Sequence, residues 1–307
     1  MNPKTWLIAL ITFIVIGVLS IEAFYQTHKY NRHYVDYLIN TKLDQLKNKE
    51  FETIILGDSL AHNAIGALKL HSYILDLTSN NALSVAGNYF LLKRYLKQNK
   101  KPKNLYYFVV PGHLYQNLDT QYTYSYFTTV FTQEDEIENI QKIKPNLFKE
   151  DYSFSKYTEK RLKALKFWTH YNVAPKKSLP IQINENDLIK KENFMNAKIE
   201  NKIKYLREMK NTINVVPKKY IDRIVTLCNT LDINFILVIE PIPKLSNKLF
   251  LQSDMYKFLQ EKNIFIYNIN DIYTFNNYFF RYDGRHIRAK VNQYYQNLID
   301  ENIVDIY

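Results

Sequence analysis

A serine that directly follows a predicted buried strand is the first candidate for chemistry in this chain. The segment Leu56-Gly57-Asp58-Ser59-Leu60 comes after the apolar, β-branched run 51–56, which predicts a strand. Gly57 permits a sharp turn from that strand into a helix, and open α/β sheets place their sites at such carboxyl ends. Ser59 is therefore a candidate nucleophile. The alternative is that Asp58 or Ser59 only caps the following helix.

A second polar cluster lies near the other end of the sequence, at Asp283-Gly284-Arg285-His286. A nucleophilic serine needs a base within hydrogen-bond reach, and the base needs a carboxylate that orients it. Asp283 can hold one ring nitrogen of His286 and leave the other for Ser59. The alternative is a polar turn in front of a final helix.

Taken together, the two motifs resemble the SGNH/GDSL hydrolase superfamily, in which a serine follows the first strand and an Asp-x-x-His precedes the last helix. The resemblance covers roughly residues 51–117 and 217–299. It implies a flavodoxin-like three-layer α/β fold with a parallel central sheet and no cofactor. It also implies that Ser59 is the nucleophile, His286 the general base and Asp283 its orienting partner.

The chain departs from the family pattern at two places that concern the oxyanion hole. The second block usually supplies a glycine amide, and the corresponding stretch 79–84 has none, so Asn80 or Asn81 is the candidate replacement beside the Ser59 amide. The third block usually supplies the asparagine of G-x-N, where this chain has Leu114. His113 and Asn117 are candidate pocket residues that could fill the gap; otherwise the hole is incomplete. Loss of one such donor costs about 100–1000-fold in turnover.

The beginning of the chain predicts a membrane anchor. Residues 6–21 are apolar apart from Thr12 and Ser20, and Ala23 to Tyr25 extend the run toward the roughly 20 residues that a bilayer needs. A cleaved signal peptide is the alternative, but its apolar region is usually shorter, about 7–15 residues, and the best cleavage site, at Ala23, is poor. We expect residues 1–25 to be an uncleaved anchor and 26–50 a polar, helical stalk.

The rest of the chain predicts an α/β domain in two pieces, 51–118 and 216–307, separated by a mostly helical insertion or lid at 119–215. Unalternating apolar runs predict strands at 51–56, 73–77, 105–110, 234–240 and 264–267. Helical patterns lie between them at 84–98 and 218–231, with a further helix before the last strand and a final one at 288–299. Such alternation indicates a parallel sheet covered on both sides.

Composition excludes several classes of protein. The six glycines are too scattered for a G-x-G-x-x-G or Walker loop, and the single cysteine, Cys228, allows neither an internal disulfide nor a cysteine-based zinc cluster. No histidine and carboxylate spacing predicts a metal site. The net charge of +11 is spread along the chain, so we expect no nucleic-acid partner.

The anchor narrows the resemblance to envelope SGNH-like proteins: the alginate acetylation proteins, the peptidoglycan O-acetyltransferases and, more distantly, the D-alanyl transfer protein of teichoic acid systems. That group implies a single-pass protein of the inner (cytoplasmic) membrane whose domain faces the periplasm or cell exterior. It implies an envelope glycan as acyl acceptor and a membrane-bound O-acyltransferase as candidate partner. The expected activity is serine-dependent acyl transfer or ester hydrolysis, and the alternative is a catalytically decayed glycan-binding or assembly protein.

Overall fold

Five short strands form one parallel sheet in the computed structural model, as the unalternating apolar runs predict. The model describes residues 2–28, 43, 46–65, 68, 70–79, 83–115, 118, 130–131, 133–143, 214–242 and 244–272. The strands are β1 (Thr53–Gly57), β2 (Ile74–Asp76), β3 (Asn104–Val109), β4 (Asn234–Ile239) and β5 (Phe265–Asn268). The prediction of a parallel α/β domain is therefore confirmed, with strand bounds within two residues of those expected.

The strand order is β2-β1-β3-β4-β5. Thr53 of β1 pairs with Ile74 of β2 on one side and with Asn104 of β3 on the other. The chain thus passes from β1 to one edge of the sheet and then crosses back to β3. This order is one of the two common doubly wound arrangements, and its crevice lies where the order reverses, between the carboxyl ends of β1 and β3.

One face of the sheet packs against α3 (Ser59–Ile65) and the short α12 (Ile269–Ile272). Alternate strand residues such as Ile55 and Phe108 are fully buried there, because successive side chains in a strand point to opposite faces. This face forms one contiguous apolar cluster.

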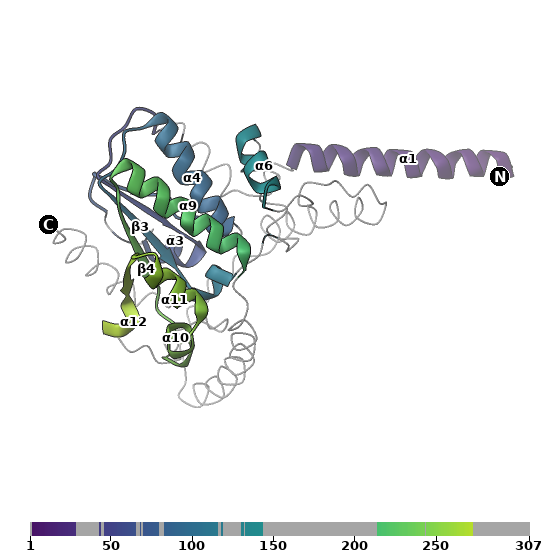
Figure 1. Ribbon diagram of the computed structural model, residues 1–307. Coiled ribbons are helices and arrows are strands. Elements are labelled where there is room, and N and C mark those ends of the chain that lie inside the picture. The colour runs from purple at the N-terminus through teal and green to yellow at the C-terminus, as the bar shows by residue number, and fades with distance from the viewer. Residues whose placement is uncertain are drawn as a thin grey trace, which may run out of the picture. The chain divides into compact units, whose positions relative to one another are not determined.

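The helices α4 (Ser84–Gln98) and α9 (Val215–Leu231) contact each other and lie side by side across the sheet (Figure 1). Phe90 of α4 and Tyr220 of α9 are fully buried, and their rings meet edge to face with centroids 5.6 Å apart. Pro217 lies in the first turn of α9, where a missing amide proton breaks no hydrogen bond of the helix.

The remaining described helices of this domain follow β3 and β4. A 3-10 turn, η3 (Pro111–Tyr115), comes directly after β3. Between β4 and β5, where one helix was predicted, the structure has two, α10 (Lys244–Leu251) and α11 (Asp254–Glu261). Ser253 separates them, because its hydroxyl caps α11 by accepting the Tyr256 amide proton at 3.2 Å. The predicted final helix 288–299 lies outside the described residues.

The chain divides into two compact units, one comprising Met1–Thr41 and Thr128–Ile181 and the other Lys42–Phe127 and Gln182–Tyr307. The sheet belongs to the second unit. The first contains α1 (Pro3–His28) and α6 (Glu134–Gln141), and α6 begins with a capping box between Gln133 and Glu136. Apart from residues 130–131, 133–143 and 214–215, the predicted insertion lies outside the described residues.

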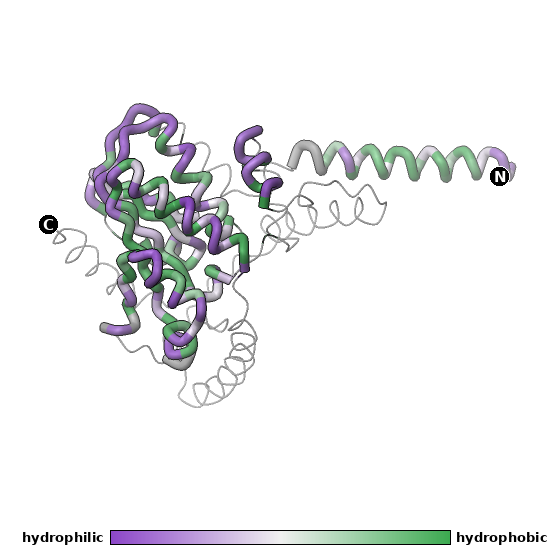
Figure 2. The backbone as a smooth tube through the Cα atoms, in the orientation of Figure 1, coloured by the Kyte–Doolittle hydropathy of each residue, from purple (hydrophilic) through white to green (hydrophobic). Residues whose placement is uncertain are grey.

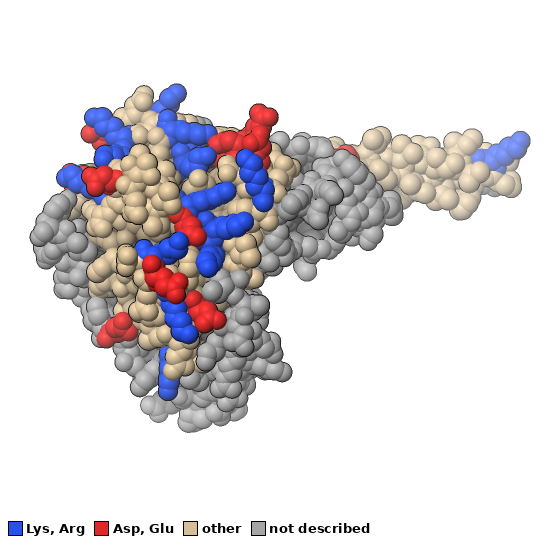
Figure 3. All heavy atoms as spheres, viewed as in Figure 1, with Lys and Arg blue, Asp and Glu red and all other residues tan. Residues whose placement is uncertain are grey.

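The helix α1 is long and apolar enough to cross a bilayer over Pro3–Phe24, and it is the single such helix in the part of the chain that the structure describes. Its 22 spanning residues correspond to about 33 Å at 1.5 Å per residue, which matches a hydrocarbon core of roughly 30 Å. Figure 2 shows α1 hydrophobic along most of its length, and Figure 3 shows basic atoms at its amino end.

The last residues of the predicted stalk bond to the end of α4. Residues 46–48 form a turn, and the Asn48 amide donates to the Gln98 carbonyl at 3.2 Å, at the end of α4. The Lys49 amide donates to the Asn99 side chain, also at 3.2 Å, and Leu43 and Leu46 are buried. The α/β unit therefore begins before residue 51, and residues 29–42 of the stalk lie outside the described residues.

Candidate functional site

Polar side chains follow four neighbouring strands at the same edge of the sheet. Because all five strands are parallel, their carboxyl ends meet at that edge. Asp58 follows β1, Thr78 follows β2, His113 lies in the turn after β3 and Glu240 follows β4. All four are buried, with exposed fractions between 1% and 6%. Burying these polar groups costs free energy unless they find partners. Open α/β sheets also place their sites at this edge, which makes it the candidate functional site.

Ser59 is the first residue of α3 and is half-buried at this edge. The neighbouring Asp58 accepts the Leu60 amide proton at 2.6 Å, so Asp58 caps the helix as the structural alternative predicted. Ser59 begins α3 at the carboxyl end of β1, where the strand order reverses between β1 and β3. The geometry is thus compatible with the nucleophile prediction, and the cap does not depend on the Ser59 hydroxyl.

Asp58 also contacts the buried side chain of His113. The second carboxylate oxygen of Asp58 contacts His113 Nδ1, and both side chains are less than 8% exposed. The pair bridges the ends of β1 and β3, the position where the strand order reverses. The His113 amide donates to the Val110 carbonyl at 2.8 Å, which fixes the turn that carries the ring. His113, predicted as a pocket residue, is therefore held by Asp58 below the surface.

Beneath this pair lies a fully buried phenol, Tyr107 of β3. Burial raises the pKa of Tyr107 above its ordinary value, and the negative charges of Asp58 and, more weakly, Glu240 raise that pKa further. A hydrogen bond with the Asn88 side chain of α4 acts in the opposite direction. Tyr107 therefore stays neutral at physiological pH and serves as a buried hydrogen-bonding group.

Sequence reasoning missed the Asp58–His113 pair and the buried Glu240. The available signal was simple: each of these residues comes within a few positions of the end of an unalternating apolar strand. Parallel pairing brings such positions to one edge even when they are far apart in sequence. What the sequence could not supply was the strand order, which makes β1 and β3 neighbours.

Five of the predicted site residues lie outside the described residues: Asn80, Asn81, Asn117, Asp283 and His286. Their approach to Ser59 stays a prediction. Among the residues that the structure describes, no group of three or more His, Cys, Asp or Glu side chains could hold a metal ion. Cys228 is fully buried within α9, and burial raises the pKa of its thiol to about 12.

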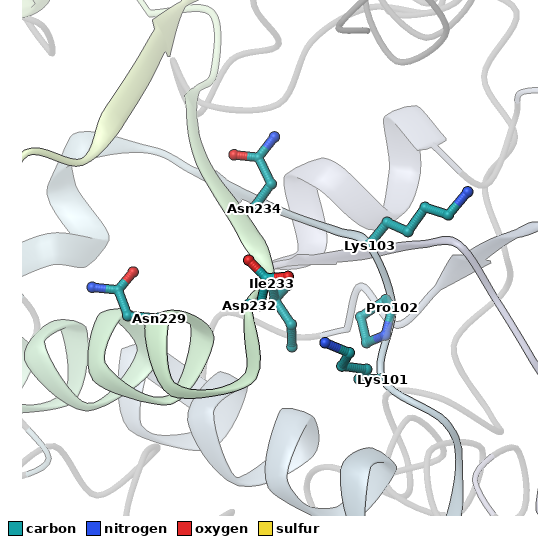
Figure 4. A pocket seen from close by; sticks show the side chains of 7 residues that line it. All are labelled: Lys101, Pro102, Lys103, Asn229, Asp232, Ile233 and Asn234. Carbon is teal, nitrogen blue, oxygen red and sulfur yellow. The ribbon is translucent and has the colours of Figure 1, made fainter.

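A hollow of about 690 Å³ lies at the opposite edge of the sheet, between the segment before β3 and the turn from α9 to β4 (Figure 4). Its two lysines already have partners, because Lys101 Nζ donates to the Leu231 carbonyl at 2.8 Å and Lys103 Nζ lies 3.0 Å from a Glu52 carboxylate oxygen. The hollow is at the amino ends of the strands, away from Ser59, and we assign it no part in the site.

Substitution of Gly57 should disturb the packing at this edge of the sheet. A Cβ there would lie 2.5 Å from the Ala61 Cβ and 3.1 Å from the Phe108 carbonyl oxygen. We expect Gly57→Ala to lower the free energy of unfolding by about 1–3 kcal/mol, because neither the helix nor the neighbouring strand can yield without shifting backbone. Urea unfolding followed by circular dichroism measures the change.

Gly112→Ala is the matched control, since among the described residues no atom beyond its own neighbours in the chain lies within 4 Å of the Cβ that it would add. We expect it to change the free energy of unfolding by no more than about 0.5 kcal/mol. Equal stability of the two variants would show that α3 does not approach β1 and β3 as closely as described.

The fold defines the class of protein: a parallel α/β domain on a chain with one apolar N-terminal helix. Compared with models of known protein families and with curated proteins, the chain gives no match.

Proposed function

We propose that Ser59 is the nucleophile of a site that transfers or hydrolyses an acyl group, most simply acetyl, on a cell-envelope glycan. The observation that supports this proposal is the position of Ser59, two residues after the end of β1, where the order of the β2-β1-β3-β4-β5 sheet reverses. The resemblance to SGNH/GDSL hydrolases, which rests on Gly57-Asp58-Ser59-Leu60 and Asp283-x-x-His286, adds the chemistry.

In the proposed reaction the Ser59 oxygen attacks the acyl carbonyl while His286 takes the hydroxyl proton. The proton then goes to the leaving group, and the acyl group stays on Ser59 as an ester. Asp283 orients His286, and backbone amides at Ser59 and near Asn81 hold the oxyanion. A glycan hydroxyl or a water molecule then attacks the ester and loses its proton to His286, which returns one to Ser59. Transfer and hydrolysis differ only in which of these acceptors reaches the ester.

The proposed place of action is the outer face of the inner membrane, with α1 as a single-pass anchor. A membrane-bound O-acyltransferase is the proposed source of the acyl group, as in the envelope proteins that the chain resembles. An envelope glycan would be the acceptor.

The buried position of His113 favours a second candidate, a glycan-binding or assembly protein with a decayed site. The third block has Leu114 where the family has an asparagine, and Leu114 is fully buried. His113 was one of the two candidate replacements, and its Nδ1 contacts Asp58; the other, Asn117, lies outside the described residues. Loss of one oxyanion donor would leave weak activity or none.

Labelling with a fluorophosphonate, which modifies activated serines, separates the two candidates. The full-length protein is treated in detergent and digested, and the modified peptide is mapped by mass spectrometry. Modification of Ser59 supports the enzyme. A folded protein that never labels at Ser59 supports the binding protein.

The anchor is tested by removing it. We expect the full-length chain to retain residues 1–25 after export and to stay in the membrane fraction through an alkaline carbonate wash. Deletion of residues 1–25 should move the protein to the soluble fraction, because about 33 Å of apolar helix is lost. A mature N-terminus beyond residue 23 would mean a cleaved signal peptide, and continued membrane association of the deleted form would mean a second attachment.

A further inference from the structure

Three polar side chains form a hydrogen-bonded row beside Ser59, and the proposed reaction does not use them. Asp76 ends β2, and its Oδ1 accepts the Thr78 amide proton at 2.8 Å. The same Asp76 oxygen contacts the Thr78 hydroxyl. The Thr78 oxygen lies 3.3 Å from Nδ1 of His62, which is on α3.

The protons in this row have one consistent arrangement. A carboxylate only accepts hydrogen bonds, and a hydroxyl has a single proton to donate. Thr78 therefore donates to Asp76, and its oxygen accepts from His62 Nδ1–H. A neutral imidazole with its proton on Nδ1 has a lone pair on Nε2. In this neutral form of His62, the row presents Nε2 as a hydrogen-bond acceptor.

His62 lies about one helical turn beyond Ser59 on α3. His62 is three residues beyond Ser59, and residues at that spacing are neighbours on a helix surface, with Cβ atoms about 5–6 Å apart. The turn between them is formed, because the His62 amide donates to the Asp58 carbonyl at 2.8 Å. The Ser79 amide donates to the Gly57 carbonyl at 3.1 Å, which holds the Thr78 segment against the end of β1. His62 is exposed, so a molecule arriving from solvent can reach its ring.

We infer that His62 is a positioning residue for the acyl acceptor: Nε2 accepts a hydrogen bond from the hydroxyl that approaches the Ser59 ester. This inference rests on the proposed function and names the residue that binds its second substrate. His62 takes no part in forming the ester. Asp76 and Thr78 act through His62 by fixing its ring and its tautomer.

Two substitutions of His62 separate a role for Nε2 from a role in structure. The amide of Gln places a polar atom near the position of Nε2, whereas the shorter Asn reaches only the position of Nδ1. With p-nitrophenyl acetate as donor and water or methanol as acceptor, the first burst of p-nitrophenol reports formation of the Ser59 ester, and the steady state reports its removal. Both phases are measured on the full-length protein in detergent.

We expect His62→Asn to leave the burst rate within about twofold and to slow the steady state by about 100-fold, the effect typical of a misplaced reactant. His62→Gln should restore most of the steady-state rate. A burst slowed as much as the steady state, or an unchanged steady state in His62→Asn, overturns the inference. A wild-type protein with no burst and no Ser59 labelling removes the proposed function itself, and this role of His62 with it.

The tautomer has its own measurement, which does not depend on activity. In the protein labelled with ¹⁵N-histidine, the nitrogen shifts of the His62 ring distinguish a proton on Nδ1 from one on Nε2. We expect the Nδ1–H form in the wild type and in Thr78→Ser, which keeps the hydroxyl, and a mixture in Thr78→Val, which lacks it. An Nε2–H form in the wild type would contradict the inference directly.

Discussion

Replacement of Ser59 by alanine is expected to remove the burst of p-nitrophenol and to lower ester turnover by at least about 10⁴-fold, because the proposed acyl intermediate forms on the Ser59 oxygen. The free energy of unfolding should change by no more than about 0.5 kcal/mol. The reason is local: Asp58, not Ser59, accepts the Leu60 amide proton that caps α3. Stopped-flow release of p-nitrophenol and urea unfolding measure the two quantities on the same preparation.

Ser72→Ala is the control for this experiment. Ser72 is exposed in the turn before β2, at the opposite edge of the sheet from Ser59. We expect Ser72→Ala to match the wild type in both measurements. If Ser59→Ala turns over ester as fast as Ser72→Ala does, Ser59 is not the nucleophile, and the decayed-site candidate becomes the better explanation.

The second large effect concerns the free energy of unfolding. It tests the contact between Asp58 and His113 at the ends of β1 and β3. Replacing His113 with leucine leaves the Asp58 carboxylate buried without its imidazole partner. Leaving a buried polar group without its partner costs about 1–3 kcal/mol, and more where that group is charged. The side chains of Asp58 and His113 are only 6% and 7% exposed, so water cannot take the place of the lost partner. Urea unfolding followed by circular dichroism should show a much lower midpoint for His113→Leu.

Asp58→Asn provides the matched background, since the amide oxygen can still accept the Leu60 amide proton while the charge is lost. We expect His113→Leu to cost less in that background than in the wild type. The difference, the coupling between the two positions, should be about 0.5–3 kcal/mol. If the two substitutions lower the free energy of unfolding additively, the two side chains do not interact.

The sequence predicted the sheet well because its signals are local. An apolar run such as 105–110 is long enough for one strand, and Pro111-Gly112 ends it. The helix 84–98 was predicted with its observed bounds, since its apolar residues recur on one face. The two helices between β4 and β5 were harder to predict, because the break between them is a serine cap with neither glycine nor proline.

The site was predictable only in part, for a physical reason. Gly57 and Ser59 could be found because they come at the end of an apolar, β-branched run. The structure has Gly57 as the last residue of β1 and Ser59 as the first residue of α3. The partner of Asp58 could not be found in this way, because His113 lies 55 positions further along the chain. The two residues meet only through the pairing of β1 with β3. The row from Asp76 to His62 likewise depends on the pairing of β2 with β1. Nothing in the local sequence encodes these pairings.

Because Cys228 is buried, a cysteine introduced elsewhere can be used to probe the electrostatics of the proposed site. It is the only cysteine of the chain, and its inaccessible thiol stays protonated at neutral pH. A cysteine introduced elsewhere would therefore be the sole reactive thiol without any need for a cysteine-free background. In Ser59→Cys, the rate of alkylation as a function of pH would report the field that the surrounding groups impose at the position of the proposed nucleophile.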